Sequence, residues 1–188
     1  MTDTIESPAE NDLAAAAKSP WWFVPTLYFL QGLPYFLVAE LFAVVYKNLG
    51  IDNLQITLWT GLAVLPWTFK MFWAPLVELN ATRRKWTLAM QILLIITLAF
   101  SAAAMTSNAY FGLTVGAMFV IATLSATHDI ACDGLYLMSL DRSKQAAFSG
   151  VLSASSRMAR LFVTGFVLFL VGLLQGRGLT LRGAWAVG

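Results

Sequence analysis

The chain has few charges and few of the reactive side chains that enzymes use. Charged residues make up 12% of its 188 residues, and it contains one cysteine and one histidine. With only Cys132, no internal disulfide can form, and we expect no metal site because His128 has no Cys or His partner at ligand spacing. The sequence also lacks a Gly-x-Ser-x-Gly elbow and a Gly-rich phosphate loop. We therefore expect no cofactor and no enzymatic activity.

Basic residues are also too sparse for nucleic-acid binding. The net charge is only +2, and no long basic run with interleaved aromatic residues is present, so we expect no nucleic-acid partner. Hydrophobic residues make up 59% of the chain, and the mean hydropathy is +0.70. Soluble domains contain about 45 to 50% apolar and 25% charged residues. The composition therefore predicts an all-α membrane protein that crosses the bilayer several times.

Five stretches are apolar enough to cross a membrane, since a span needs about 20 mostly apolar residues. Residues 1–20 contain four acids and one lysine and predict a short disordered cytoplasmic tail, not a secretory signal. Another apolar segment begins at 184–188, so residues 21–188 are expected to form a partial, truncated bundle. The predicted spans cover about residues 21–46, 54–77 with a bend at Pro66, 86–105, 110–140 and 145–174.

The loops between these spans predict the orientation in the membrane. Basic residues lie in the loops at 82–85 and 141–144, whereas the loops at 48–53 and 106–109 contain none. Basic loops are usually cytoplasmic, so we expect a cytoplasmic N-terminus.

Three ionisable residues interrupt the apolar fourth span: His128, Asp129 and Asp133. A charge at the centre of a membrane helix costs roughly 2.5 to 3.5 kcal/mol, so such residues usually face a bundle interior or a water-filled path. Residues three and four apart share a helix face, so the three residues form a polar stripe and a candidate transport site. His128 is either a proton-relay group or a hydrogen-bonded structural residue.

A second polar stripe, which includes Arg157, runs along the fifth span. Asp129 lies twelve residues before Asp141, and Arg157 lies twelve after Gln145. At 1.5 Å per residue, both lie roughly 18 Å from the turn between the two spans. We therefore predict an ion pair between Asp129 and Arg157, or an Arg157 shared between Asp129 and a substrate. A purely structural salt bridge is the alternative.

The same counting places Lys70 of the second span level with Asp133. These two residues are possible partners, although Lys70 can instead extend its ammonium group to the cytoplasmic interface. Glu40 lies in the outer third of the first span, and its role stays open. Gly32 and Pro34 are predicted to break the first span within the membrane, as happens near substrate paths.

Three motifs carry a resemblance that spans about residues 21–175. They are Gln31-Gly-Leu-Pro-Tyr-Phe36, then Lys70-Met-Phe-Trp-Ala-Pro-Leu-Val-Glu78 with Arg83-Arg-Lys-Trp86, and Thr127-His-Asp-Ile-Ala-Cys-Asp-Gly134. In this order they resemble the first half of the major facilitator superfamily. More narrowly, they resemble its peptide and acetyl-coenzyme A transporter branch, which includes the AmpG-type muropeptide permeases.

The resemblance implies a twelve-helix fold of two bundles, of which this chain supplies five helices of the N-terminal six-helix bundle. In that superfamily an acid followed by basic residues, between the second and third helices, latches the cytoplasmic gate. Carried over, Glu78, Arg83 and Arg84 are the gate residues. The family usually has aspartate at the position of Glu78, and the permeases have glutamine at the position of His128.

The function implied is proton-coupled import of muropeptide or a related sugar-peptide across the inner membrane by alternating access. The partners would be the substrate, protons, the lipid bilayer and the missing C-terminal half. Arg157 would attract an anionic substrate group, and Asp129 or Asp133 would carry the proton. The alternative is a truncated membrane protein that does not transport and that associates with, or senses, another component. The complete expected path comprises Gln31, Tyr35, Glu40, Lys70, His128, Asp129, Asp133 and Arg157.

Overall fold

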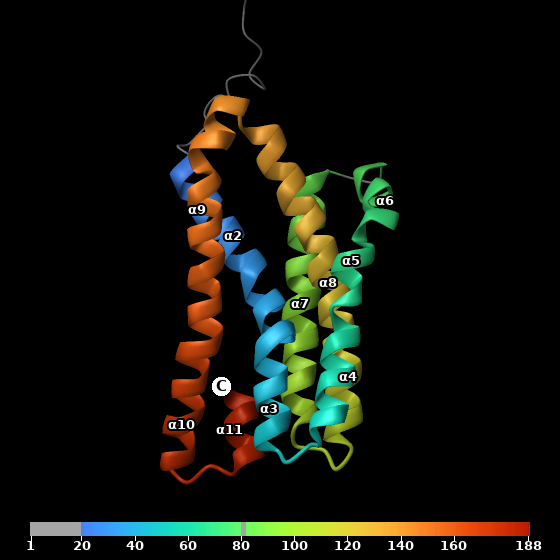
Figure 1. Ribbon diagram of the computed structural model, residues 1–188, viewed down its shortest axis with the longest axis vertical. Coiled ribbons are helices and arrows are strands. Elements are labelled where there is room, and N and C mark those ends of the chain that lie inside the picture. Colours follow the sequence, from blue (N-terminus) through green and yellow to red (C-terminus); the bar gives the residue numbers. More distant parts are fainter. Residues whose placement is uncertain (1–19, 80–81) are drawn as a thin grey trace, which may run out of the picture.

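The computed structural model describes residues 20–79 and 82–188, and within these ranges the chain forms helices and no strand (Figure 1). The predicted tail, up to residue 19, lies outside the described residues. The elements are α2 (Pro20–Phe36), the π-turn η1 (Leu37–Leu41), α3 (Phe42–Asn48), α4 (Asn53–Ala63), α5 (Leu65–Phe69), the 3-10 turn η2 (Lys70–Phe72), α6 (Ala74–Leu79), α7 (Arg83–Ala104), α8 (Tyr110–Ser139), α9 (Arg142–Leu161), the π-turn η3 (Phe162–Val167), α10 (Leu168–Gly176) and α11 (Leu181–Val187).

Four helical segments are long and apolar enough to cross a membrane, which confirms an all-α membrane protein. They are Pro20–Asn48, Arg83–Ala104, Tyr110–Ser139 and Arg142–Gly176, and they match four of the five predicted spans. The remaining stretch, 54–77, is divided into α4, α5, η2 and α6.

Two prolines account for the division of that stretch. Pro66 lies in the first turn of α5, directly after the interruption at Val64, and Pro75 lies in the first turn of α6, after Trp73. A proline has no backbone N–H, and its ring clashes with the carbonyl four residues earlier, so a regular helix does not continue through it without a kink. The bend expected at Pro66 is therefore present, and a second one follows.

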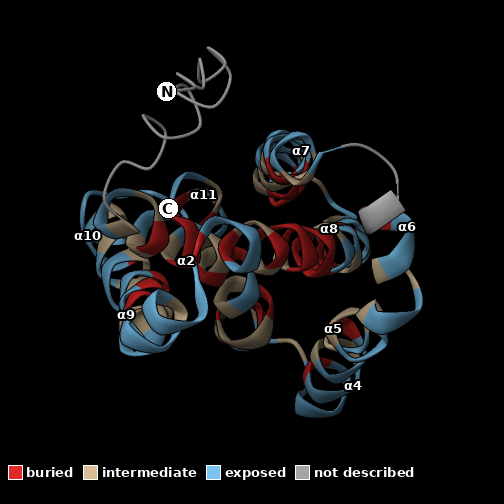
Figure 2. Ribbon diagram, turned by 90° about the horizontal axis from the view of Figure 1, so that it is seen from above, coloured by how far each residue is buried: buried red, intermediate tan, exposed pale blue. Residues whose placement is uncertain are grey.

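Helix α2 lies between α8 and α9 (Figures 1 and 2). It packs along α9 and also contacts α8, while α7 packs along the other side of α8. Figure 2 shows α8 at the centre of the molecule with buried residues along much of its length. Helices α2 and α9 run in the same direction, since Trp21 contacts Phe148 near their start and Glu40 contacts Arg160 further along.

The first span is not broken at Gly32 and Pro34, which corrects the prediction from the sequence. Helix α2 continues through both residues, and the irregular turn η1 follows Phe36. The close packing of α2 against α9 holds this part of the backbone in place. A Cβ atom added at Gly32 would lie 2.8 Å from the Cβ of Ala159, so only glycine permits this contact. Pro34 has no N–H to donate to the carbonyl of Leu30, one turn earlier, and the π-turn η1 follows on its C-terminal side.

Helix α9 begins with a side-chain cap at Asp141. The carboxylate of Asp141 accepts a hydrogen bond from the backbone N–H of Lys144 at 2.8 Å. This hydrogen bond lowers the pKa of Asp141, because it stabilises the ionised carboxylate. The cap fixes the turn between α8 and α9, which is the turn from which residue depths were counted above.

Candidate functional site

Five polar side chains meet where α2, η2 and α8 approach one another, and we refer to them as the Lys70 cluster. The ammonium of Lys70 contacts the carboxylate of Asp129, and the Gln31 amide donates a hydrogen bond to the same carboxylate. Asp133, one turn further along α8, lies 4.0 Å from the Lys70 Nζ. The hydroxyl of Tyr28 donates to the Asp133 Oδ1 at 3.1 Å. A single lysine therefore interacts with two carboxylates.

The two carboxylates of this cluster differ in their surroundings. The side chain of Asp129 is 17% exposed and carries both the Lys70 contact and the Gln31 hydrogen bond, whereas that of Asp133 is 45% exposed. With Lys70 protonated and both carboxylates ionised, the cluster carries one net negative charge. The pairing of Lys70 with Asp133 expected from the sequence is present, but Asp129 is the closer partner.

A cavity of about 430 Å³, the polar cavity, lies beside this cluster between α5, η2, α7 and α8. Lys70, Asp133 and Arg83 all line it. The guanidinium of Arg83 lies directly against the backbone of Gly134, where a Cβ atom would be 2.6 Å from the Arg83 Cζ. The polar cavity thus joins the Lys70 cluster to the predicted gate residue Arg83.

The predicted ion pair between Asp129 and Arg157 does not form. Asp129 pairs with Lys70 instead, and Arg157 is exposed on α9 with no ion pair to any described residue. The prediction that Asp129 and Arg157 lie at the same depth was correct, because Gln31 contacts Asp129 while the adjacent Gly32 contacts Ser156, next to Arg157. The error lay in treating α8 and α9 as a packed hairpin, since α2 lies between them.

A second ion pair lies further along α2 and α9, and the sequence analysis did not find it. The Arg160 Nε lies 2.8 Å from a carboxylate oxygen of Glu40, and the guanidinium stacks 6.0 Å from the centre of the Phe36 ring. Glu40 lies within η1, and Arg160 lies two residues before η3. The sequence did contain a signal for this pair. Glu40 is 20 residues into its span and Arg160 is 18 into its own, so the two residues lie at nearly equal depth in helices that run in the same direction.

Comparison with known proteins assigns the chain to a family. The model of the BT1 family matches residues 31–173. The chain belongs to the BT1 family. It is also similar to two proteins named "Putative transporter AmpG 4", from Rickettsia conorii and Rickettsia felis, each 26% identical over 152 residues. The aligned region is 75% of this chain and 36% of each relative, so the chain spans about a third of the length of these curated relatives.

These matches confirm the resemblance to AmpG-type permeases that the motifs indicated. No solved structure matches the chain. The BT1 match includes four members of the Lys70 cluster and also both residues of the second ion pair. Tyr28 alone lies just before the matched region, and no sequence signal singled it out.

Besides Glu40 and Arg157, two further predicted path residues of this BT1 chain lie apart from the Lys70 cluster. His128 is fully buried, and its ring nitrogens lie 3.5 and 3.6 Å from the Cys132 Sγ. This packing favours a structural role for His128 over a role in proton relay. Tyr35 is 36% exposed and packs edge-on against Trp67, which lines the polar cavity.

The three predicted gate residues lie at the ends of α6 and α7. Arg83 lines the polar cavity, and Arg84 is exposed beside it. Glu78 belongs to α6, but its side chain is outside the described part of the structure. The gate contact between an acid and these arginines therefore stays a prediction.

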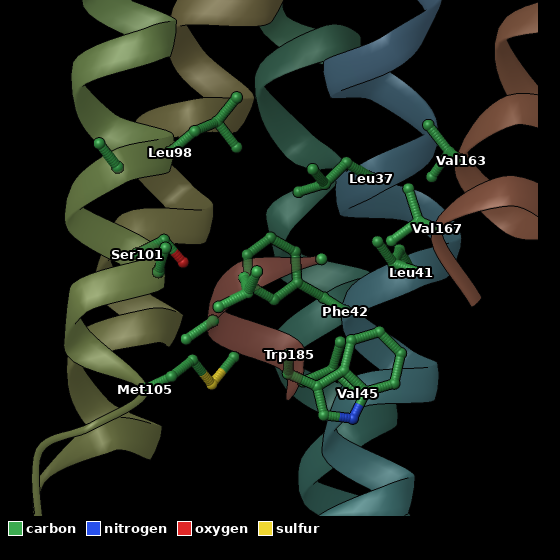
Figure 3. Close-up of a pocket in the computed structure, with 15 residues that line it drawn as sticks. Leu37, Leu41, Phe42, Val45, Leu98, Ser101, Met105, Val163, Val167 and Trp185 are labelled. Carbon is green, nitrogen blue, oxygen red and sulfur yellow. The ribbon is translucent and has the colours of Figure 1, made fainter. Parts of the chain in front are cut away.

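An apolar cavity of about 350 Å³ lies near the opposite end of the bundle from the polar cavity. Figure 3 shows the side chains that line it. Its walls are mainly aliphatic and aromatic side chains of η1, α3, α7 and η3, together with Trp185 of α11. It contains none of the ionisable residues expected from the sequence. Neither the Lys70 cluster nor the second ion pair contributes a residue to this cavity.

Proposed function

We propose that this chain forms part of a proton-coupled secondary transporter that imports a muropeptide or a related anionic sugar-peptide by alternating access. The observation that carries the proposal is the Lys70 cluster, where Lys70 of η2 is shared by two carboxylates of α8, a helix long enough to span a membrane. Ionisable groups at such depth usually mark substrate or proton pathways. Membership of the BT1 family supports transport over catalysis.

Arg157 supports an anionic substrate. It is exposed, it has no ion pair among the described residues, and it lies one turn or less from the contact between Gly32 and Ser156. A cation left unpaired at membrane depth is costly unless a partner compensates it. A carboxylate of the sugar-peptide would supply that partner.

Gln31 supports a substrate that also donates hydrogen bonds. Its side-chain amide donates to Asp129, while its Oε1 is buried and has no hydrogen-bond partner among the described residues. Buried polar atoms are usually hydrogen-bonded. A sugar hydroxyl or a peptide N–H would donate to this oxygen, and both groups occur in muropeptides.

We propose that the membrane is the inner membrane and that the N-terminus is cytoplasmic, because the loops at 82–85 and 141–144 are basic. The polar cavity then opens toward the cytoplasmic side, where Arg83 and Arg84 belong to the gate. Alternating access would come from movement of this bundle against the rest of the transporter.

Uptake by the complete gene product in proteoliposomes tests this function. With an inward proton gradient, we expect accumulation of a labelled muropeptide and none of an uncharged disaccharide. Arg157→Gln should raise the KM for the muropeptide, since its carboxylate loses its partner, while Arg177→Gln, at the exposed end of α10, should transport normally. Absence of muropeptide uptake by the complete protein would contradict the proposal and support a non-transporting role.

A further inference from the structure

We propose that Asp133, and not Asp129, takes up and releases the coupled proton, and that it does so through the polar cavity. This inference rests on the proposed proton coupling and deepens it, because the sequence alone left the two aspartates equivalent. The geometry distinguishes them by their partners, their exposure and their access to the cavity.

Asp129 is held as the permanent counter-ion of Lys70. Its carboxylate contacts the ammonium and accepts the Gln31 hydrogen bond, and it is only 17% exposed. Protonation of Asp129 would break the closer ion pair and leave the Lys70 charge with a partner 4.0 Å away. Breaking a partly buried ion pair is costly. Asp129 therefore keeps its charge through the transport cycle.

Asp133 is free to change its protonation state at lower cost. It is 45% exposed, it lines the polar cavity, and its ion-pair contact with the described residues is the 4.0 Å approach of Lys70. The Tyr28 hydroxyl, which donates at 3.1 Å, is able to donate or accept and so stays bonded to either form of the carboxyl group. Protonation at Asp133 leaves the pair between Lys70 and Asp129 intact.

The charged and titratable groups around Asp133 come from four elements. Tyr28 belongs to α2, Lys70 to η2, Asp129 and Cys132 to α8, and Arg83, which lies against the backbone of Gly134 beside Asp133, to α7. A proton from water in the cavity binds a carboxylate oxygen of Asp133, while Lys70 stays protonated. The Lys70 cluster then changes from one net negative charge to neutral. The neutral form removes an unbalanced charge from an apolar bundle, and release of the proton to the cavity restores it.

Infrared spectroscopy of the complete protein in lipid nanodiscs tests the assignment without substrate. The carbonyl stretch of a protonated carboxylic acid is resolved from other bands and grows as the pH is lowered. Every protonated carboxyl group contributes to this band, so the Asp133 component is obtained from the difference between variants. We expect a component that is present in the wild type and in Asp129→Asn and that is missing from Asp133→Asn. Loss in Asp129→Asn with retention in Asp133→Asn would overturn the assignment, as would absence of the band from the wild type.

Tyr28→Phe gives an independent signature if an aspartate variant fails to fold. Phenylalanine keeps the edge-on packing against Tyr136, at 5.6 Å between ring centres, and removes only the hydroxyl. We expect the band to remain but to shift in frequency, because the Asp133 carboxyl group loses its hydrogen bond. An unshifted band would show that the titrating group is not Asp133.

The route of the proton is tested by cysteine labelling at the cavity-lining Leu137 in a Cys132→Ala background. A bulky thiol reagent at Leu137→Cys should slow deuterium exchange of the carboxylic acid, since Leu137 lines the polar cavity. The same reagent at Leu113→Cys, an exposed position near the other end of α8, should not. Equal effects at both positions would exclude the polar cavity as the route. These measurements do not depend on transport, so their outcome is unchanged if muropeptide is not the substrate. If the assignment to Asp133 is wrong, muropeptide uptake can still occur, with another group as the proton carrier.

Discussion

The ion pair between Lys70 and Asp129 should stabilise the protein measurably. At an effective dielectric constant of about 20, unit charges about 3 Å apart attract by roughly 5 to 6 kcal/mol. Desolvation of both groups offsets part of this attraction, and removing one partner of a buried pair costs about 3 to 5 kcal/mol. Water screens this pair in part, because its side chains are 33% and 17% exposed. We therefore expect Lys70→Met to lower the free energy of unfolding by about 2 to 3 kcal/mol.

A double-mutant cycle measures the interaction itself. Lys70→Met, Asp129→Asn and the double variant would be compared by reversible unfolding in mixed micelles. The double variant should lose less stability than the sum of the single variants, with a coupling energy of about 2 kcal/mol. The control is the exposed pair of Lys144 with Asp141, 3.5 Å apart with both side chains 60% exposed, which should show no coupling outside the error of the measurement. Equal coupling in the two pairs would refute the reasoning.

Three further predictions follow from backbone contacts and from the cap of α9. Gly134→Ala should displace Arg83 and reduce uptake while the protein stays folded, whereas Gly116→Ala, which has no atom within 4 Å of its added Cβ, should leave uptake unchanged. Gly32→Ala should lower the free energy of unfolding by about 1 to 3 kcal/mol, because α2 must move away from α9; unaltered stability would contradict the close approach. Because its pKa is lowered on folding, Asp141 stabilises α9 above its unfolded pKa of about 3.9 and loses this effect as the pH falls through the folded value. Amide protection at the start of α9 should therefore decrease in acid, and should not do so in Asp141→Asn.

The apolar runs predicted most of the fold, because a helix that crosses a bilayer must be long and mostly apolar. They did not show that the second run is divided, since a hydropathy average does not register the missing N–H of a proline. Pro66 signalled one bend, and Pro75 was an equal signal that was not used. Pro34 predicted a break, but α2 continues through this residue and the irregular turn η1 follows. The sequence therefore predicted where the spans begin and end more accurately than whether the backbone within each span is continuous.

The candidate site was predictable as a set of residues but not as a set of pairs. Asp129 and Asp133 were conspicuous because charges in an apolar helix are costly. Their partners depend on which helices are neighbours, and sequence order suggested α8 beside α9 when α2 lies between them. Tyr28 gave no signal, because a single tyrosine in an apolar span carries no charge and its sequence position does not show which polar group its hydroxyl contacts.

The most direct test of the account compares exchange with accumulation in Asp133→Asn. Exchange of labelled for unlabelled muropeptide across the proteoliposome membrane needs only alternating access, whereas accumulation against a gradient also needs the coupled proton. We predict that Asp133→Asn retains exchange and no longer accumulates substrate under an imposed proton gradient. Accumulation by Asp133→Asn equal to that of the wild type would contradict it.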